Sequence, residues 1–150
     1  MGEVLDQQLY ALLASWNPDG SIHAVPVVYL YADGQLLIAT SSTTRKARNI
    51  AARSDVTVTV DDREQLRWVS AVGCAELVGG ERSRALNQRL YGRWMTPDGL
   101  DVIGGILAED EDVTIVVTPR RWLSWDIESG FYQPLRELGI SLDQPDRWFL

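Results

Sequence analysis

The sequence predicts a mainly β protein, a small antiparallel barrel of six to seven strands with two or three short helices. Short runs rich in valine, threonine and aromatic residues recur along the chain, as β-strands require. Turn signals at Asn17–Gly20 and Asp33–Gly34 separate the first of these runs. The 150 residues are 45% hydrophobic, which is enough for one core in a single domain spanning residues 1–150. Closing the sheet into a barrel would protect its edges.

The first three strands are predicted to form an antiparallel meander. Two tight turns join them, and they cover Leu5–Trp16, Ser21–Tyr31 and Gln35–Ala39. Pro26 lies inside the second strand and cannot donate a ladder hydrogen bond, so we expect a bulge or a sheet edge there. That defect leaves some backbone free to face something other than a strand.

The rest of the chain is predicted to alternate short helices and strands. A helix at Arg45–Arg53 has apolar residues at helical spacing, and hydroxyl residues before it can cap it. The elements expected after it are strands at Val56–Val60 and Trp68–Val78, a helix at Glu81–Met95, a loop at Met95–Gly105, and strands at Val113–Thr118 and Arg121–Ile127 broken by Pro119. The tail from Ser129 has no clear pattern.

Composition and charge disfavour several function classes. The formal net charge of −7 disfavours nucleic acids and anionic membranes as partners, because both are polyanions. Met1–Tyr10 lacks the pattern of a signal peptide, and no apolar run approaches the ~20 residues of a membrane helix. With a single cysteine no intramolecular disulfide can form. We therefore expect a cytoplasmic protein.

Residues that commonly carry catalysis are scarce. His23 is the only histidine, so a histidine-based metal cluster is not expected, and we assign His23 a structural or surface role. Cys74 is expected to be a buried small hydrophobe. No glycine-rich dinucleotide or P-loop motif occurs.

The segment Ser41–Arg53 is the most informative for function. It holds four of the 14 Lys and Arg residues, including Lys46, the only lysine. Arg45 and Lys46 fall in the first helical turn, where the helix dipole disfavours each cation by roughly 0.3–1 kcal/mol. Cations, hydroxyl groups and free backbone N–H groups together predict an anion site, with phosphate as the natural ligand. A solvated basic helix face is the alternative.

A second feature is the apolar strand around Val25, Pro26, Val27 and Val28. Its proline defect precedes the predicted anion site, so this strand could present backbone and small side chains to a flat ring. Trp68 is expected to flank the same space. Ordinary core packing is the alternative for both.

The order of these features resembles one known family. From about Leu9 to Ile127 the chain is similar to the split-barrel FMN-binding proteins related to pyridoxamine 5′-phosphate oxidase, especially the actinobacterial branch that uses a deazaflavin coenzyme. The resemblance rests on the segments Ser21–Tyr29, Arg45–Arg53, Val56–Val60, Val72–Val78 and Val116–Trp125. It implies a split β-barrel of the FMN-binding type and a homodimer with cofactor sites at the interface.

The resemblance also implies residue roles and a cofactor. Lys46 and Arg48, with Ser41 and Ser42, would hold the cofactor phosphate. Val25–Val28 would line the ring, with Trp68 from either subunit. The residues that we expect to bind cofactor are Val25, Pro26, Val27, Val28, Ser41, Ser42, Arg45, Lys46, Arg48, Asn49 and Trp68. No catalytic residue is assigned, but Tyr29 and Tyr91 are candidates for a proton donor. The sequence departs from true pyridoxamine phosphate oxidases at Asp146–Leu150, where those proteins carry a basic arginine–leucine segment, so that activity is not expected.

Four functions remain open at this point. The first is an oxidoreductase that uses coenzyme F420 to transfer a hydride to an unsaturated or electron-poor small molecule. The second is an FMN-dependent oxidoreductase of the same fold. The third is a carrier that binds a flavin or deazaflavin without turnover. The fourth is an interaction domain that uses the basic helix as its binding surface. The longer anionic tail of F420 favours a broad basic groove, which Arg45, Arg48 and Arg53 could supply.

Overall fold

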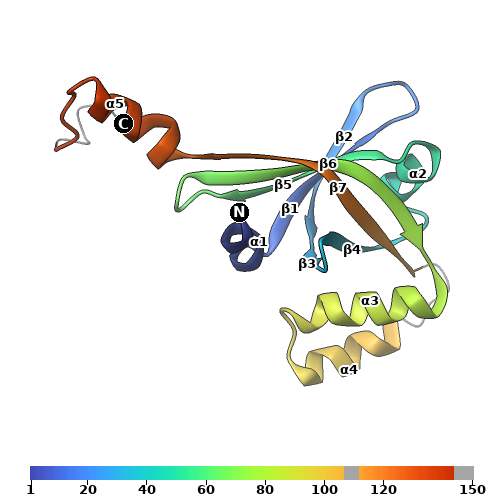
Figure 1. Ribbon diagram of the computed structural model, residues 1–150. Helices are drawn as coiled ribbons and strands as arrows, with labels where there is room; N and C mark the ends of the chain where they lie inside the picture. The colour runs from blue at the N-terminus through green and yellow to red at the C-terminus, as the bar shows by residue number, and fades with distance from the viewer. Residues whose placement is uncertain (107–111, 144–150) are drawn as a thin grey trace.

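A curved antiparallel sheet dominates the computed structural model, which describes residues 1–106 and 112–143 (Figure 1). Its strands lie in the order β2-β1-β5-β6-β7-β4-β3. Their bounds are β1 (Tyr10–Trp16), β2 (Ile22–Val28), β3 (Leu30–Ala32), β4 (Gln35–Ser41), β5 (Asp55–Asp62), β6 (Arg67–Val78) and β7 (Asp112–Asp126). Seven antiparallel strands in the described part of the chain confirm the predicted mainly β, split-barrel fold class.

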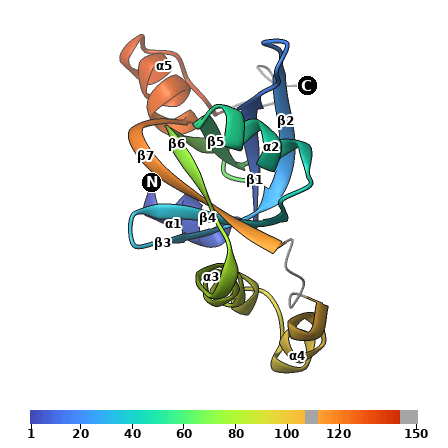
Figure 2. The same cartoon turned by 90° about the vertical axis from the view of Figure 1, so that its right-hand side faces the viewer.

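Short helices surround this sheet. They are α1 (Gly2–Gln7), α2 (Arg45–Ala52), α3 (Gly80–Gly92), α4 (Pro97–Ile106), a π-helical turn η1 (Glu128–Tyr132) and α5 (Gln133–Glu137). In Figures 1 and 2, α3 and α4 lie together on one side of the sheet and α5 lies at the opposite end. No described helix is long and apolar enough to cross a bilayer.

The sheet curls back on itself at Tyr29. The two strands at the ends of the sheet order, β2 and β3, are consecutive in the chain and only Tyr29 separates them. Strand β2 pairs with β1 and strand β3 pairs with β4, both antiparallel, which confirms the predicted meander. Tyr29 is 0% exposed, and it joins a core made from the inward faces of the strands. The predicted strand Ser21–Tyr31 is therefore divided where it passes from one neighbour to the other.

The two predicted closing strands are one continuous strand, β7, which corrects the sequence interpretation. Pro119 does not end the strand, because a register shift between Val72 and Gly73 of β6 accommodates it. Gly73 pairs with Pro119, and a Cβ atom on Gly73 would lie 2.2 Å from the carbonyl oxygen of Thr118. The glycine thus permits a close backbone approach at the bulge.

Two helices lie where a loop and a strand were predicted, and η1 and α5 lie in the tail that showed no clear pattern. The segment expected to be a loop at Met95–Gly105 contains α4, with Pro97 as its first residue and the Thr96 hydroxyl accepting a hydrogen bond from the Gly99 N–H at 3.1 Å. This is an N-terminal capping pattern that the glycines obscured. Helix α1 occupies the start of the first predicted strand, so that strand begins only at Tyr10.

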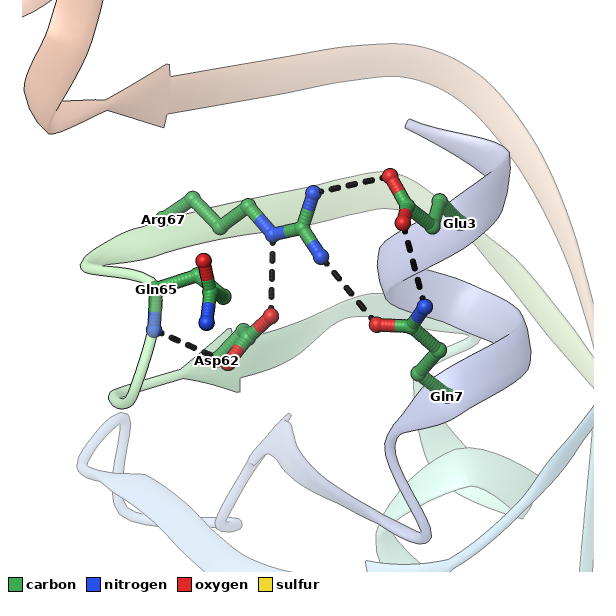
Figure 3. A network of polar contacts seen from close by, with 5 residues as sticks. All are labelled: Glu3, Gln7, Asp62, Gln65 and Arg67. Carbon is green, nitrogen blue, oxygen red and sulfur yellow. Dashed lines mark hydrogen bonds and ion pairs between the residues drawn. The ribbon is translucent and has the colours of Figure 1, made fainter.

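A polar network holds α1 against the β5–β6 hairpin (Figure 3). Arg67 on β6 donates to Asp62 at 2.9 Å, to Glu3 at 3.0 Å and to Gln7 at 3.2 Å. The hydrogen bond from Arg67 lowers the pKa of the Glu3 carboxyl. A six-residue helix is not stable alone, so these tertiary contacts determine where it lies.

Candidate functional site

Helix α2 begins at a hydroxyl-rich turn. Thr44 is its N-cap, and its Oγ1 accepts a hydrogen bond from the Ala47 N–H at 3.4 Å. The same hydroxyl donates to the Ser41 carbonyl at 2.9 Å, and the Ser41 hydroxyl pairs with that of Thr43. The helix was predicted with this start because its cap and its apolar spacing are local in sequence.

Lys46 is a half-buried cation without a counter-ion. It makes no hydrogen bond or ion pair within the described residues, and burial lowers the pKa of its ammonium group. Arg45 and Arg48 are exposed and equally unpaired in that part of the chain, and the backbone N–H groups of Arg45 and Lys46 have no acceptor there. Unpaired cations beside free N–H groups form an arrangement that an anion stabilises. We call Ser41, Ser42, Arg45, Lys46 and Arg48 the α2 cluster.

Arg53, at the other end of this helix, is already paired. It donates to Asp55 at 3.4 Å, and its guanidinium lies 4.2 Å from the centre of the Trp16 ring. Its charge is partly compensated inside the protein, so it differs from the α2 cluster.

Asn49 fastens α2 to the barrel. Its side chain is 2% exposed, and its amide donates to Ser15 at 3.2 Å and to Asn17 at 2.9 Å, both in or next to β1. Its Oδ1 is buried without a partner in the described structure. Asn49 therefore lies on the face of α2 that packs on β1, and not among the exposed cations.

Strand β2 is an edge strand, as the proline predicted. Among the described residues it is hydrogen-bonded to β1 alone, so half of its backbone polar groups face away from a partner there. Successive side chains alternate between faces: Val25 and Val27 pack into the core, whereas Pro26 lies opposite Leu12 on the outer face. Val28 packs with a second apolar cluster beside α3. The four residues therefore do not present their side chains to one ring together.

A hollow of about 730 Å³ lies on the outer face of the sheet. We call it the outer-face hollow; its lining includes Pro26 and Trp68, which the sequence analysis expected to flank one space. The remaining lining residues are Gln8, Tyr10, Ala11, Leu12, Thr59, Asp61, Arg63, Ser70 and Leu123. They come from β1, β5, β6, β7 and the segments beside them, and sequence spacing alone could not have grouped them.

The outer-face hollow is mostly apolar and aromatic, with compensated charges. The charged residues among its described lining, Asp61 and Arg63, pair with each other at 2.8 Å. Thr59 and Ser70 share a hydroxyl hydrogen bond of 2.9 Å across β5 and β6. An apolar hollow with a few polar groups is typical of a small-molecule site.

Strand β2 connects the α2 cluster with the outer-face hollow. Arg45 and His23 line a second hollow of about 600 Å³ together with Asn17, Pro18 and Asp19. His23 and Pro26 are three residues apart on an extended strand, which corresponds to about 10 Å. Figure 2 shows α2 in front of the strands, near β2. The side chains of His23 and Pro26 point to opposite faces of the sheet, so one elongated ligand that reached both places would pass across the free edge of β2.

Neither tyrosine candidate lies in this region. The Tyr29 hydroxyl is buried and donates to the Leu5 carbonyl at 2.8 Å, and burial raises its pKa. Tyr91 lies in α3, edge-on to Trp94 with 5.7 Å between ring centres, and burial raises its pKa as well. Tyr10, which sequence reasoning missed, is the tyrosine in the lining of the outer-face hollow.

Metal-ligating residues do not gather in the described residues, where no group of three or more His, Cys, Asp or Glu side chains could hold an ion. Cys74 is half-buried, which corrects the expectation of a buried residue. Arg120, the extra residue at the bulge opposite Gly73, donates a hydrogen bond to the Cys74 sulfur. Asp146–Leu150, where the sequence departs from true pyridoxamine phosphate oxidases, lies outside the described residues.

Comparisons with known proteins agree with this fold. The sequence profile of the family described as pyridoxamine 5′-phosphate oxidase matches residues 1–126. Among solved structures, an F420 reductase is 24% identical over 81% of this chain and 94% of its own, with a TM-score of 0.65. A conserved hypothetical protein from Mycobacterium tuberculosis is 23% identical over 93% and 85%, with a TM-score of 0.72.

General stress protein 26 from Bacillus anthracis is 15% identical over 82% of this chain and 88% of its own, with a TM-score of 0.61. No curated protein matches the chain. At these identities the solved structures establish a shared fold.

Proposed function

Because the chain belongs to the pyridoxamine 5′-phosphate oxidase family, we propose that it is an oxidoreductase that binds a flavin-type cofactor along the free edge of β2. The observation that carries this proposal is Lys46, a half-buried cation at the start of α2 that forms no ion pair or hydrogen bond with any other described residue. A cation partly removed from water and lacking a partner costs stability, and a bound anion offsets that cost. A cofactor phosphate is the anion that fits the family.

The chain's own residues would bind and orient the cofactor in two places. At the α2 cluster, Lys46 and Arg48 would neutralise the phosphate, and the Ser42 hydroxyl and free N–H groups would donate to it. At the outer-face hollow, Pro26 and Trp68 would contact the ring and exclude water from it. When bound, the ring supplies the hydride-transfer chemistry, and the protein supplies position and electrostatics.

The deazaflavin coenzyme F420 is our first choice and FMN is the alternative. F420 has an anionic tail beyond its phosphate, whereas FMN ends in one phosphate. Arg45 brings a positive charge to the second hollow beside His23, away from the outer-face hollow. Hydrogen bonds from Ser21 and the charge of Arg45 lower the pKa of the Asp19 carboxyl there. Arg45 forms no ion pair with Asp19, so part of its charge is available to the ligand with more anionic groups. The fold is also that of a protein named as an F420 reductase.

We further propose that the protein works in the cytoplasm as a homodimer and acts on a small molecule. Large apolar side chains are exposed on the outer face of the sheet, on β1, β2 and β7: Tyr10, Leu12, Ile22, Leu123 and Trp125. Such a patch is typical of a protein interface, and a second copy would also shield the outer-face hollow. Sedimentation of the wild type and of Ile22→Glu tests this: we expect a dimer and a monomer, and a monomeric wild type would contradict it.

The cofactor proposal is tested by titrating the protein with FMN and with F420 while following cofactor fluorescence. We expect Lys46→Gln to weaken binding about tenfold or more, because a hydrogen bond to a charged group contributes roughly 1.5–3 kcal/mol. Arg53→Gln is the matched control, since Arg53 is on the same helix and is already paired with Asp55. The cofactor that binds more tightly is the functional one.

Two results would change the proposal. If the wild type binds neither cofactor, the oxidoreductase function is wrong. If it binds one tightly but the reduced cofactor is not reoxidised by any of a broad panel of electron-poor acceptors, the protein is a carrier. The panel should include conjugated carbonyl compounds and nitroaromatic compounds.

A further inference from the structure

Arg93, directly after α3, contacts two distant segments of the chain at once. Its Nη1 donates to the Tyr29 carbonyl at 2.9 Å, and its Nη2 lies within hydrogen-bond distance of the carbonyls of Leu5 at 3.1 Å, Asp6 at 2.7 Å and Gln8 at 2.7 Å. Its guanidinium also lies 5.0 Å from the centre of the Tyr29 ring. No function described above uses this residue.

These contacts supply the positive charge that α1 lacks at its C-terminus. The helix has six residues, and its last turn contains no basic residue. The carbonyl groups at a helix C-terminus carry partial negative charge, which a cation stabilises. Arg93 provides that cation from another part of the chain, so the path of Leu5–Gln8 depends on it.

The segments that Arg93 holds continue directly into the outer-face hollow. Gln8 lines the hollow itself, and Tyr10 lines it two residues later. Tyr29 follows Val28, and Val28 is the register partner of Tyr10 in the β1–β2 pair. Arg93 therefore holds both segments of the chain beside the Tyr10–Val28 pair, at one end of the wall that Gln8 and Tyr10 form.

We propose that Arg93 is a positioning residue for the ligand in the outer-face hollow. By binding the carbonyl groups of Leu5–Gln8 and of Tyr29, it sets the positions of Gln8 and Tyr10 against the cofactor ring. This inference rests on the proposed function, in which the hollow holds that ring. Arg93 lines neither the hollow nor the α2 cluster, so its effect passes through the backbone that it holds.

A planar guanidinium is required for this geometry. Arginine presents several donors in a rigid fork and so can serve carbonyl groups from two segments, whereas lysine offers one compact charge. Lysine at this position would keep the attraction to the end of α1 and would lose part of the bridge to Tyr29. We expect Arg93→Lys to lie between the wild type and Arg93→Gln in cofactor affinity.

The test distinguishes an effect on binding of the cofactor ring from an effect on binding of the phosphate. The wild type, Arg93→Gln and Arg93→Lys are titrated with whichever of FMN and F420 the wild type binds, and separately with inorganic phosphate, followed by the NMR signals of the Arg45 and Lys46 amides. Hydrogen exchange of residues 2–10 reports on α1. The matched control is Arg89→Gln, on α3 one turn earlier, whose partner is Asp33 in an exposed pair at 3.0 Å.

We expect Arg93→Gln to weaken cofactor binding about tenfold, to leave phosphate binding unchanged and to speed exchange in residues 2–10. Arg89→Gln should change none of these. Equal cofactor affinity in Arg93→Gln and wild type, or a loss of phosphate binding as large as the loss of cofactor binding, would overturn the inference. If Arg93→Gln does not fold, the same criteria apply to Arg93→Lys. A wild type that binds no cofactor overturns the proposed function, and the inference with it.

Discussion

Two adjacent carboxylates at the end of β5 allow a direct test of how burial sets the strength of an ion pair. Asp61 pairs with Arg63 at 2.8 Å and Asp62 pairs with Arg67 at 2.9 Å, so the two pairs have nearly equal lengths. Their surroundings differ: the side chains of Arg63 and Asp61 are 90% and 48% exposed, whereas those of Arg67 and Asp62 are 22% and 3% exposed. Only the second pair belongs to the network that holds α1 (Figure 3).

We therefore expect Asp62→Asn to reduce the free energy of unfolding much more than Asp61→Asn does. Removing one partner of a buried pair leaves the other charge uncompensated and typically costs 3–5 kcal/mol; because Glu3 still faces Arg67, we expect about 3 kcal/mol. An exposed pair contributes about 1 kcal/mol or less, since solvent screens it. The two variants should differ by about 2 kcal/mol.

Urea unfolding of both variants, followed by tryptophan fluorescence and analysed with a common slope, measures this difference. Repeating the titration at high salt should reduce the small Asp61→Asn effect further and change the Asp62→Asn effect less. Equal losses in the two variants would refute the reasoning, because burial would then not control the strength of these pairs.

Lys46→Met is expected to stabilise the ligand-free protein, because burial of the ammonium group lowers the pKa of Lys46 below its ordinary 10.5. The unfolded chain then binds more protons than the folded protein, so the stability of the wild type rises with pH toward 10.5. In chemical denaturation the stability difference between the wild type and the variant should therefore shrink at alkaline pH. An unchanged difference would contradict this. Gly73→Ala should cost about 1–3 kcal/mol, because its Cβ would lie 2.2 Å from the Thr118 carbonyl oxygen. Gly79→Ala is the control, because a Cβ there would meet open space, and both variants are compared by thermal unfolding. An equal loss of stability in Gly79→Ala would contradict the explanation by the close approach at the bulge.

Features that depend on neighbours in sequence were predictable. The cap and apolar spacing of α2 lie within a dozen residues, and the helix was predicted within one residue of its observed end at Ala52. The missing N–H of Pro26 was enough to predict a bulge or an edge, because a ladder needs that donor wherever the strand lies, and the structure has the edge. The grouping of cations around Lys46 was likewise a property of one short segment.

Other features arise only from tertiary contacts. Pro119 would end an isolated strand, yet β7 continues because Gly73 on a different strand lets the backbones approach. Helix α1 is too short to form alone, and arginines far away in sequence hold it.

By itself the sequence determined the mainly β class, a bulge or an edge at Pro26 and the basic start of α2, since periodicity, proline chemistry and local charge act over a few residues. Tertiary structure alone decided which side chains share a face. It directed Val25 and Val27 inward, turned Asn49 toward β1, and brought Tyr10 and Trp68 from separate strands to one hollow. The physical reason is that strand register, set by packing of the whole core, determines the neighbours of each outward residue.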